Sequence, residues 1–275
     1  MPHLAVNGTR LYYDDTGEGP PLLLVHGLGS STRDWYEQVE AFAADYRVLR
    51  VDLRGHGRSA RPEGPYHMAE FGRDVAVLLQ RLDAAPAHVV GLSMGGMVAL
   101  QLAADAPRLV RSLVVVNSTA DTRLHTWADV WFYLSRRVAV QVLGMRRVGH
   151  LIARRLFVEP EQEDLRREFV RRWAENDRQG YLWSVDAIMG WSVRDRLPSI
   201  TTPTLLVSSG HDYTPVSEKN RIAAAMPCAD LAVVEDARHA LPVERPAAFN
   251  AILDDFLARV AAGTFPAGDG RAQCT

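Results

Sequence analysis

The stretch Gly91-Leu92-Ser93-Met94-Gly95 constrains the fold more than any other part of the chain. It follows an apolar, β-like run at residues 87–90 and precedes a helix-like run at residues 97–104. Gly-x-Ser-x-Gly between a strand and a helix is typical of a tight turn that exposes the serine hydroxyl at the carboxyl edge of a sheet. Glycines flank the serine because a β-carbon there would collide with the neighbouring strand or helix. The helix N-terminus behind Ser93 offers a free N–H and a partial positive charge, so Ser93 is predicted to be a nucleophile.

Strand-like and helix-like patterns alternate along most of the chain. Asn7-Gly8 between two short runs indicates a hairpin. The strand–helix–strand order that follows favours a parallel sheet with helices on both faces. We predict strands over residues 3–6, 10–14, 21–26, 46–52, 88–92, 113–117, 204–208 and 231–235, and helices over residues 35–44, 67–82, 94–104, 216–225 and 247–260.

The alternation is interrupted between about residues 120 and 197, where the patterns are mainly helical. Five of the six tryptophans of the chain fall in this block. We predict that residues 120–197 form a helical cap inserted into an α/β core of residues 1–119 and 198–262. The remaining residues, 263–275, are predicted to form a loose tail.

The composition bears on partners, location and cofactors. The net charge is −2 with 23% charged residues, so neither nucleic acid nor membrane is expected as a partner. We expect a soluble cytoplasmic protein, because no apolar run reaches the roughly 18 residues of a membrane helix. Cys228 and Cys274 lack the spacing of a zinc site, and Gly-x-Gly-x-x-Gly is absent. We therefore expect no metal and no cofactor. The sequence leaves the oligomeric state open.

A serine hydroxyl attacks only when a base accepts its proton, and histidine is the usual base because its pKa lies near working pH. His239 is the candidate, since it follows the last predicted strand and the loops after parallel strands open on the edge that carries Ser93. Asp212 follows the preceding predicted strand and is the candidate acid that orients the imidazole. Asp121, after the strand at residues 113–117, is the alternative acid.

An oxyanion hole requires two backbone N–H donors. Met94, directly after the serine, is predicted to supply one. Leu28, in the loop His26-Gly27-Leu28-Gly29-Ser30-Ser31, is predicted to supply the other, because its glycines permit close backbone approach. His26 and His56 lie in glycine-rich loops and are predicted to shape those loops.

The substrate pocket is predicted to lie between the core and the cap, whose aromatic residues mostly form its own small core. The candidates for lining the pocket are Trp127, Trp131, Trp183 and, from the core, Leu241. The cap arginines, such as Arg136-Arg137, are predicted to be solvated or paired with acids. A buried arginine in the cap would instead indicate an acidic substrate.

Several motifs together resemble the α/β-hydrolase superfamily over about residues 20–245. They are His26-Gly27-Leu28-Gly29, Asp52-Leu53-Arg54-Gly55-His56-Gly57-Arg58-Ser59, Gly91-Leu92-Ser93-Met94-Gly95-Gly96, Asp212 before Thr214-Pro215, and His239. Residues 54–59, Gly64-Pro65-Tyr66 and residues 91–97 are similar to the 3-oxoadipate enol-lactonases and their relatives. The resemblance implies an α/β-hydrolase fold, with a mostly parallel sheet of about eight strands flanked by helices and an inserted helical cap.

The resemblance also implies a cofactor-independent serine hydrolase. Such an enzyme would cleave a small-molecule carboxylic ester or lactone through an acyl-enzyme on Ser93. The dehalogenases and epoxide hydrolases of the superfamily use an aspartate nucleophile, so a serine at this position disfavours both. Carbon–carbon bond hydrolysis and perhydrolysis remain open on the same triad, as does a ligand receptor or binding protein with vestigial hydrolysis.

Overall fold

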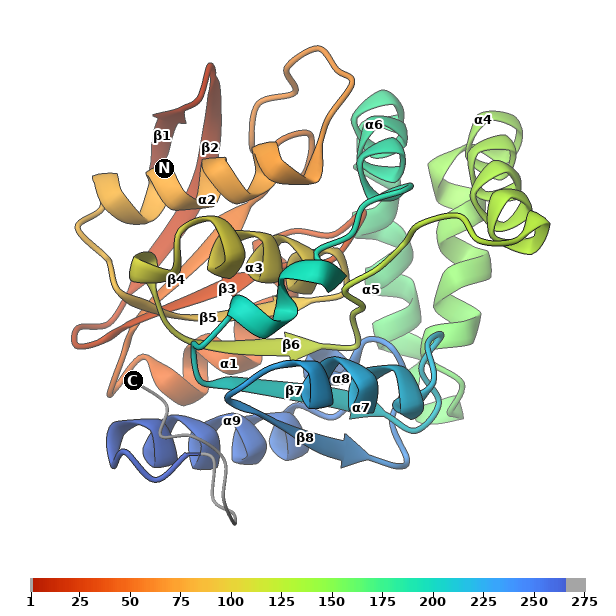
Figure 1. The fold of residues 1–275 in the computed structure, drawn as a ribbon. Helices are drawn as coiled ribbons and strands as arrows, with labels where there is room; N and C mark the ends of the chain where they lie inside the picture. Colours follow the sequence, from red (N-terminus) through yellow and green to blue (C-terminus); the bar gives the residue numbers. More distant parts are fainter. Residues whose placement is uncertain (1, 266–275) are drawn as a thin grey trace.

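A computed structural model describes residues 2–265 of the chain. Within these residues, eight strands form one sheet in the order β1-β2-β4-β3-β5-β6-β7-β8 (Figure 1). The strands β1, β2 and β4 pair antiparallel, whereas all pairs from β4 to β8 are parallel. The prediction of a mostly parallel sheet of about eight strands flanked by helices is confirmed.

The strands lie where the hydrophobic pattern predicted them, with ends that differ by up to three residues. Asn7 and Gly8 turn the chain between the first two strands, and both have positive φ, at 39° and 73°. The strands are β1 (His3–Val6), β2 (Thr9–Thr16), β3 (Pro21–Val25), β4 (Arg47–Asp52), β5 (Ala87–Leu92), β6 (Val110–Val116), β7 (Thr204–Ser209) and β8 (Ala229–Val234).

The long helices of the core also follow the prediction, whereas the short helix α8 and the 3-10 turns at Thr32–Trp35, Pro107–Leu109 and Arg194–Ser199 had not been predicted. The core helices are α1 (Tyr36–Phe42), α2 (Met68–Arg81), α3 (Met94–Asp105), α7 (Val216–Ala225), α8 (Leu241–Glu244) and α9 (Pro246–Ala261). Between β6 and β7 lie α4 (Trp127–Leu156), α5 (Glu163–Ala174) and α6 (Arg178–Ile188).

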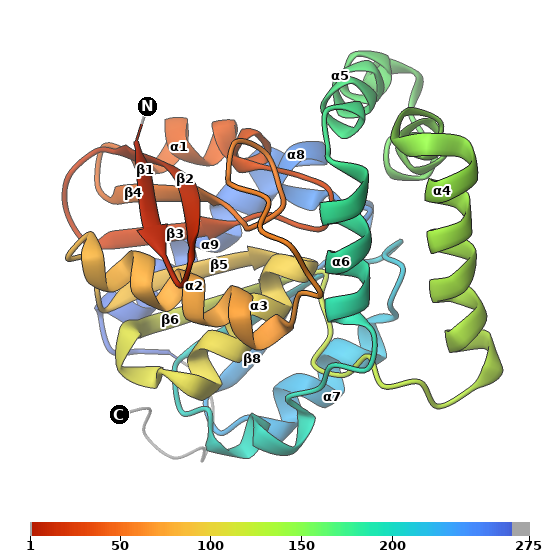
Figure 2. The ribbon, with the colours of Figure 1, turned by 90° about the horizontal axis from the view of Figure 1, so that it is seen from above.

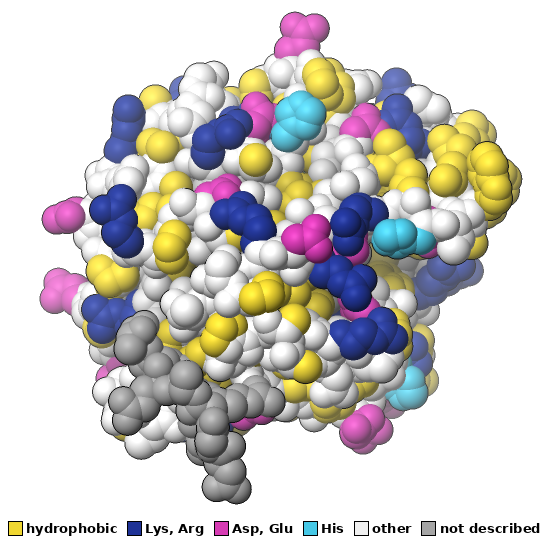
Figure 3. All heavy atoms as spheres, in the orientation of Figure 1, with side chains coloured by type: hydrophobic (Ala, Val, Ile, Leu, Met, Phe, Trp, Pro, Cys, Tyr) yellow, Lys and Arg dark blue, Asp and Glu magenta, His cyan; other side chains and the backbone are white. Residues whose placement is uncertain are grey.

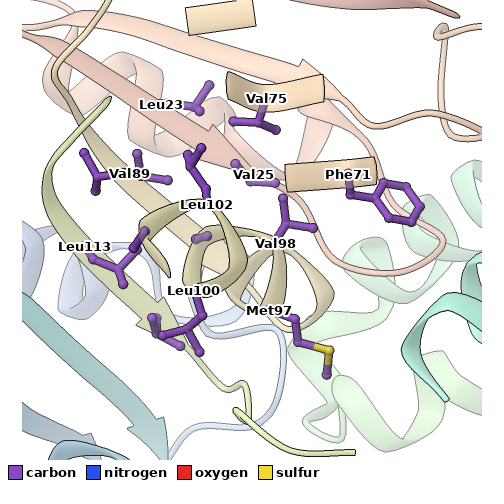
Figure 4. Close-up of a cluster of buried hydrophobic side chains, with 14 of the residues drawn as sticks. Leu23, Val25, Phe71, Val75, Val89, Met97, Val98, Leu100, Leu102 and Leu113 are labelled. Carbon is purple, nitrogen blue, oxygen red and sulfur yellow. The ribbon is translucent and has the colours of Figure 1, made fainter. Parts of the chain in front are cut away.

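Alternate residues of the parallel strands enter two different cores, one on each face of the sheet. Leu23 and Val25 of β3 pack with residues of α2 and α3 (Figure 4). Leu22 and Leu24, which point the other way, pack with residues of α1 and α9. All four side chains are fully buried, and each such burial stabilises the fold by roughly 1.5–3 kcal/mol. Packing on both faces holds the carboxyl edge of the sheet rigid beneath the site.

The helices α4, α5 and α6 stand together at one end of the sheet (Figure 2). The two ends of this segment meet at its base, where the Val193 N–H donates to the Ala120 carbonyl at 2.9 Å and the Gly190 N–H donates to the Thr122 carbonyl at 3.1 Å. Gly144, with φ 74° and ψ 167°, breaks α4 into two parts. The paired base supports our proposal that residues 120–197 are a cap inserted into the core.

The predicted tail must begin later than residue 263. Phe265 is 6% exposed and packs edge-on against Phe256 of α9, with 4.8 Å between the ring centroids. The guanidinium of Arg259 lies over the same ring. The loose-tail prediction is therefore wrong for residues 263–265, because an aromatic side chain attaches them to α9. The rest of the predicted tail lies outside the described residues.

Candidate active site

Ser93 lies in the turn between β5 and α3, as its flanking glycines predicted. Its backbone is left-handed, with φ 55° and ψ −116°, a conformation that costs a non-glycine residue about 1–3 kcal/mol. A β-carbon on Gly91 would lie 2.2 Å from the Gly95 carbonyl oxygen, and one on Gly95 would lie 2.1 Å from the Val25 carbonyl oxygen. Both positions therefore require glycine. The turn is strained and closely packed, and it presents the serine to a cavity.

His239 and Asp212 come together although 27 residues separate them in the sequence. The Nδ1 atom of His239 donates to Oδ1 of Asp212 at 2.5 Å. The carboxylate is fully buried, whereas the imidazole is 18% exposed. Because the acid occupies Nδ1, the ring offers Nε2 to a reacting group. His239 and Ser93 line the same cavity, so the structure brings the three predicted residues together at one site.

Asn117 braces the loop that carries His239, a role that the sequence analysis did not predict. Its side-chain amide donates to the backbone carbonyl of His239 at 3.0 Å and to the Ser209 hydroxyl at 2.8 Å. Its amide oxygen accepts the Ser209 N–H at 2.8 Å. One polar side chain at the end of β6 thus connects β7 to the histidine loop. Its place directly after a buried strand was the available signal.

Asp212 remains ionised under all ordinary conditions. Burial alone would raise the pKa of this carboxyl group. The hydrogen bond and charge of His239, together with the charge of Lys219, outweigh burial and lower the pKa to about 2. A negative carboxylate suits the acid of a triad, because it stabilises the imidazolium that forms when the base accepts a proton.

The low pKa of Asp212 predicts a specific loss of stability in acid. The folded pKa lies below the ordinary value of 3.8, so the stabilisation is complete above about pH 4 and is lost as the pH falls towards 2. Between about pH 5 and about pH 2, wild type is expected to lose about 2 kcal/mol more unfolding free energy than Asp212→Asn. Urea unfolding at both pH values measures the difference. Equal losses in the two proteins would contradict the assignment of this shift.

The proposed oxyanion donors lie on both sides of Ser93. Met94 opens α3, where a backbone N–H has no helical acceptor. A β-carbon on Gly27 would lie 3.4 Å from Cβ of Ser93, so the loop before Leu28 runs directly against the nucleophile. Within residues 2–265, the N–H groups of Leu28 and Met94 have no hydrogen-bond partner. Both amides are therefore available for an oxyanion.

The alternative acid, Asp121, lies in a different environment. Its carboxylate accepts from the guanidinium of Arg123 at 2.8 Å, and Arg194 lies 3.9 Å away. The charge of Asp121 is thus neutralised at the base of α4. Of the two aspartates that the sequence offered, the structure pairs Asp212 with His239.

His26 and His56 lie where the sequence analysis placed them, inside the glycine-rich loops. The Nε2 atom of His26 accepts the Leu53 N–H at 3.0 Å, and its Nδ1 atom donates to the Gly27 carbonyl at 2.7 Å. Burial lowers the pKa of His26 to about 4 and that of His56 to about 3. Both rings are neutral near pH 7 and form hydrogen bonds with the backbone of these loops.

A cavity of about 220 Å³ opens above Ser93 and His239. Its walls are mainly apolar and come from both the core and the helices between β6 and β7. The large side chains in the walls are Leu28, Met97, Phe132, Tyr133, Ile152, Leu156, Phe169, Trp173, Ile188 and Tyr213. Such a cavity can take an organic molecule of modest size and keep water away from the reacting group.

The four residues predicted to line this pocket are not in its walls. Trp127 and Trp131 are 89% and 71% exposed on α4, where hydrophobic side chains gather on the surface (Figure 3). Trp183 of α6 packs on Gly64 and on the ring of Tyr66. Leu241 is fully buried in the core that α1 and α9 share. The prediction named the correct segment but the wrong residues, because Tyr133 and the partly exposed Phe132 are the aromatic residues of α4 that line the cavity.

Arg136 of α4 also lines the cavity, contrary to the prediction that the cap arginines are solvated or paired with acids. Its Nε atom donates to the hydroxyl of Tyr181 at 2.5 Å. Arg136 forms no salt bridge with any residue that the structure describes. Its neighbour Arg137 behaves as predicted, because its guanidinium pairs with Asp186.

A family model described as the alpha/beta hydrolase fold matches residues 20–246. The chain belongs to this α/β-hydrolase family. The match spans the motifs around Ser93, Asp212 and His239, so the resemblance inferred from those motifs is confirmed.

Individual relatives of this α/β-hydrolase are similar over nearly their whole length. A provisionally named carbamate hydrolase of Azorhizobium caulinodans is 31% identical, covering 94% of this chain and 99% of the relative. The 3-oxoadipate enol-lactonase 2 of Acinetobacter baylyi is 28% identical, covering 93% and 96%. The crystal structure of an enol-lactonase from Burkholderia xenovorans superposes with a TM-score of 0.86 at 31% identity, covering 94% and 100%. Relatives of this chain are therefore hydrolases.

Within residues 2–265, helices that combine the length and the apolar character needed to cross a bilayer are absent. The same residues contain no group of three or more His, Cys, Asp or Glu side chains suited to hold a metal ion.

Proposed function

We propose that this protein is a cofactor-independent serine hydrolase that cleaves a carboxylic ester or lactone. The observation that carries the proposal is the hydrogen-bonded pair of His239 and Asp212, which shares one largely apolar cavity with Ser93. A strained serine at a helix N-terminus, beside an imidazole oriented by a buried carboxylate, is suited to acyl transfer.

In the proposed mechanism, Oγ of Ser93 attacks the carbonyl carbon while Nε2 of His239 accepts the hydroxyl proton. The N–H groups of Leu28 and Met94 stabilise the oxyanion. The tetrahedral intermediate then expels an alkoxide, which takes the proton from His239, and an ester of Ser93 remains. A water molecule, deprotonated by the same imidazole, attacks this ester. This attack forms a second tetrahedral intermediate. When the intermediate breaks its bond to Oγ of Ser93, His239 returns the proton to that oxygen and a carboxylic acid is released.

The relatives support this chemistry. The names of two of them refer to enol-lactones, which are cyclic esters. In a lactone the expelled alkoxide stays attached to the acyl chain, so one product leaves the cavity after hydrolysis. The same triad chemistry serves open esters and lactones, and the cavity decides between them.

Turnover tests the proposal against its alternatives. The purified protein is incubated with a panel of p-nitrophenyl esters and five- and six-membered lactones. Hydrolysis that saturates with substrate concentration is the expected result. A protein that binds small molecules but hydrolyses none of the panel would be a receptor or binding protein, and the proposal would be withdrawn.

We further propose that the substrate carries, besides the ester or lactone group, one carboxylate that Arg136 binds. Arg136 is the only lysine or arginine side chain among the described residues that line the cavity. Its Nε atom is committed to Tyr181, which leaves the two terminal nitrogens for a ligand. A guanidinium binds a carboxylate through two parallel hydrogen bonds, and these are strong in an apolar cavity.

Arg136→Met is expected to reduce kcat/KM for a hemi-ester of a dicarboxylic acid by roughly 10- to 100-fold more than for a neutral ester of the same length. The substrates are p-nitrophenyl hemi-glutarate and p-nitrophenyl pentanoate. Arg137→Met is the matched control, because the neighbouring guanidinium pairs with Asp186 and does not line the cavity. An unchanged ratio between the two substrates in Arg136→Met would eliminate the acidic-substrate proposal and leave the esterase proposal intact.

A further inference from the structure

Lys219 is the only lysine in a chain with 31 lysine and arginine residues. It lies in the first turn and a half of α7, and its side chain has no exposed surface. A lysine is almost never fully buried unless its charge is paired. The contacts of its buried ammonium group therefore indicate what Lys219 does.

The ammonium group of Lys219 lies beside the acid of the proposed triad. Its Nζ atom is 2.5 Å from Oδ2 of Asp212 and 2.7 Å from the carbonyl oxygen of Thr214, and it also donates to the Thr214 hydroxyl oxygen. Three acceptors match the three hydrogens of an ammonium group. The Thr214 hydroxyl in turn donates to Oδ2 of Asp212 at 2.8 Å.

The two carboxylate oxygens of Asp212 therefore bind different partners. Oδ2 is held by Lys219 and Thr214, whereas Oδ1 accepts from Nδ1 of His239. A carboxylate held at one oxygen cannot rotate freely about its Cβ–Cγ bond. Lys219 of α7 and Thr214, just before α7, therefore fix the direction in which Asp212 presents Oδ1 to the imidazole.

We propose that Lys219 is a positioning residue for hydrolysis. It holds Asp212 so that Oδ1 stays aimed at His239, and its positive charge offsets part of the carboxylate charge that acts on the imidazole. The inference rests on the proposed function of Ser93 and His239. Without the lysine, a buried carboxylate with no other cation within hydrogen-bond distance would keep the base protonated to higher pH, where it cannot accept the serine proton.

The choice of lysine over arginine fits this role. The chain uses arginine at every other basic position. A guanidinium is a planar fork, whereas an ammonium group is compact and directs three hydrogens to acceptors around it. The buried site beside Asp212 presents three such acceptors on two residues, so it suits the ammonium group.

Other charged and titratable groups surround the pair, and they are the same residues in wild type and in the Lys219 variants. The ring of Tyr213 lies 4.4 Å from that of His239, and burial raises the pKa of Tyr213. Arg136 and Arg155 act on Tyr213 from α4. Glu244 of α8 accepts the backbone N–H of Arg238, next to the base. A change seen on replacing Lys219 alone therefore reports the loss of its charge and its hydrogen bonds, and not the effect of these neighbouring groups.

Lys219→Met is expected to lower kcat by roughly 10- to 100-fold and to change KM less than about twofold. A loss of this size is typical when a partner that orients a functional side chain, here Asp212, is removed. Lys219→Met should also move the acidic limb of the pH profile of kcat/KM to higher pH, because the carboxylate charge that acts on the proton-accepting ring is no longer offset. Lys219→Gln retains an N–H donor without the charge. It should recover part of kcat and show the same displaced limb.

A matched control separates positioning from packing. Ile222 lies in the same helix and is 2% exposed, and its side chain packs in the core beside α2 and α3. Ile222→Ala should lower the melting temperature without moving the acidic limb. In the Asp212→Asn background, Lys219→Met should change kcat less than about twofold, because the lysine acts through the carboxylate.

Three outcomes would overturn the proposal. They are wild-type kcat in Lys219→Met, an acidic limb that stays in place, and losses that multiply in the Asp212→Asn background. If Ser93→Ala is inactive while Lys219→Met is normal, the positioning role alone fails. If Ser93→Ala is fully active, the proposed function itself fails.

The single lysine also provides a test that needs no Lys219 variant. Labelling with [15N]lysine should give one side-chain resonance in the whole protein. This resonance should shift in Asp212→Asn, because Nζ of Lys219 donates to Oδ2 of Asp212. A resonance that does not change in Asp212→Asn would contradict the proposed coupling, even if Lys219→Met does not fold.

Discussion

Replacing Ser93 with alanine is expected to lower kcat/KM for p-nitrophenyl esters by roughly 10⁴-fold or more. The variant has no hydroxyl to attack the carbonyl carbon, and the cavity, the base and the two amides that remain can only assist attack by water. The fold should persist, because alanine fits wherever a serine side chain does. Initial rates over a range of substrate concentrations, with circular dichroism of the same preparations, measure the effect.

Ser118 provides a control within the same cavity. Its hydroxyl donates to the backbone carbonyl of Ser93 at 2.7 Å, so it supports the turn without facing the base. Ser118→Ala should cost less than about tenfold, as expected for the loss of one neutral hydrogen bond. Comparable losses in the two alanine variants would show that the deficit comes from a disturbed turn and not from a missing nucleophile.

Asp212→Asn is expected to reduce kcat by about 10³- to 10⁴-fold, the second largest effect that we predict. The amide can still contact the imidazole, but its N–H₂ group favours the tautomer with the proton on Nε2, where the base must be free. Asp121→Asn is the matched control, because this aspartate pairs with Arg123. The control should retain kcat within about threefold of wild type, as is usual for substitutions that do not touch the reacting groups.

The comparison of the two aspartates can also fail. If Asp121→Asn loses more activity than Asp212→Asn, and both melt at the wild-type temperature, the acid of the triad has been assigned wrongly. The hydrogen bond between His239 and Asp212 would then not be required for catalysis.

The local patterns of the sequence were sufficient to predict most of the fold. Runs such as Leu22 to Val25 predict buried parallel strands because both faces must be apolar, and the structure buries alternate residues in two cores. Glycines around Ser93 predict a tight turn, and the structure shows which backbone oxygens exclude a β-carbon there. These features depend on residues near in sequence, so a pattern can reveal them.

The rest of the site depends on contacts between distant segments, and the sequence did not reveal it. Helical spacing shows that α4 has an apolar face but not which residues turn towards the cavity, and so Trp127 and Trp131 were wrongly chosen over Phe132. Arg136 has no local signal that separates it from the paired Arg137. The partners of Asn117 and Lys219 lie on other elements, so their roles appear only once the chain is folded.

The central claim is that an acyl group passes through Ser93, and intact-mass spectrometry of the enzyme during turnover tests it most directly. Wild type is mixed with p-nitrophenyl pentanoate and quenched in acid within milliseconds. The account predicts a species heavier by one pentanoyl group, with the added mass on the peptide that contains Ser93, and no such species in Ser93→Ala. Rapid turnover by wild type with the acyl group on a different residue, or continued turnover by Ser93→Ala, would contradict the account.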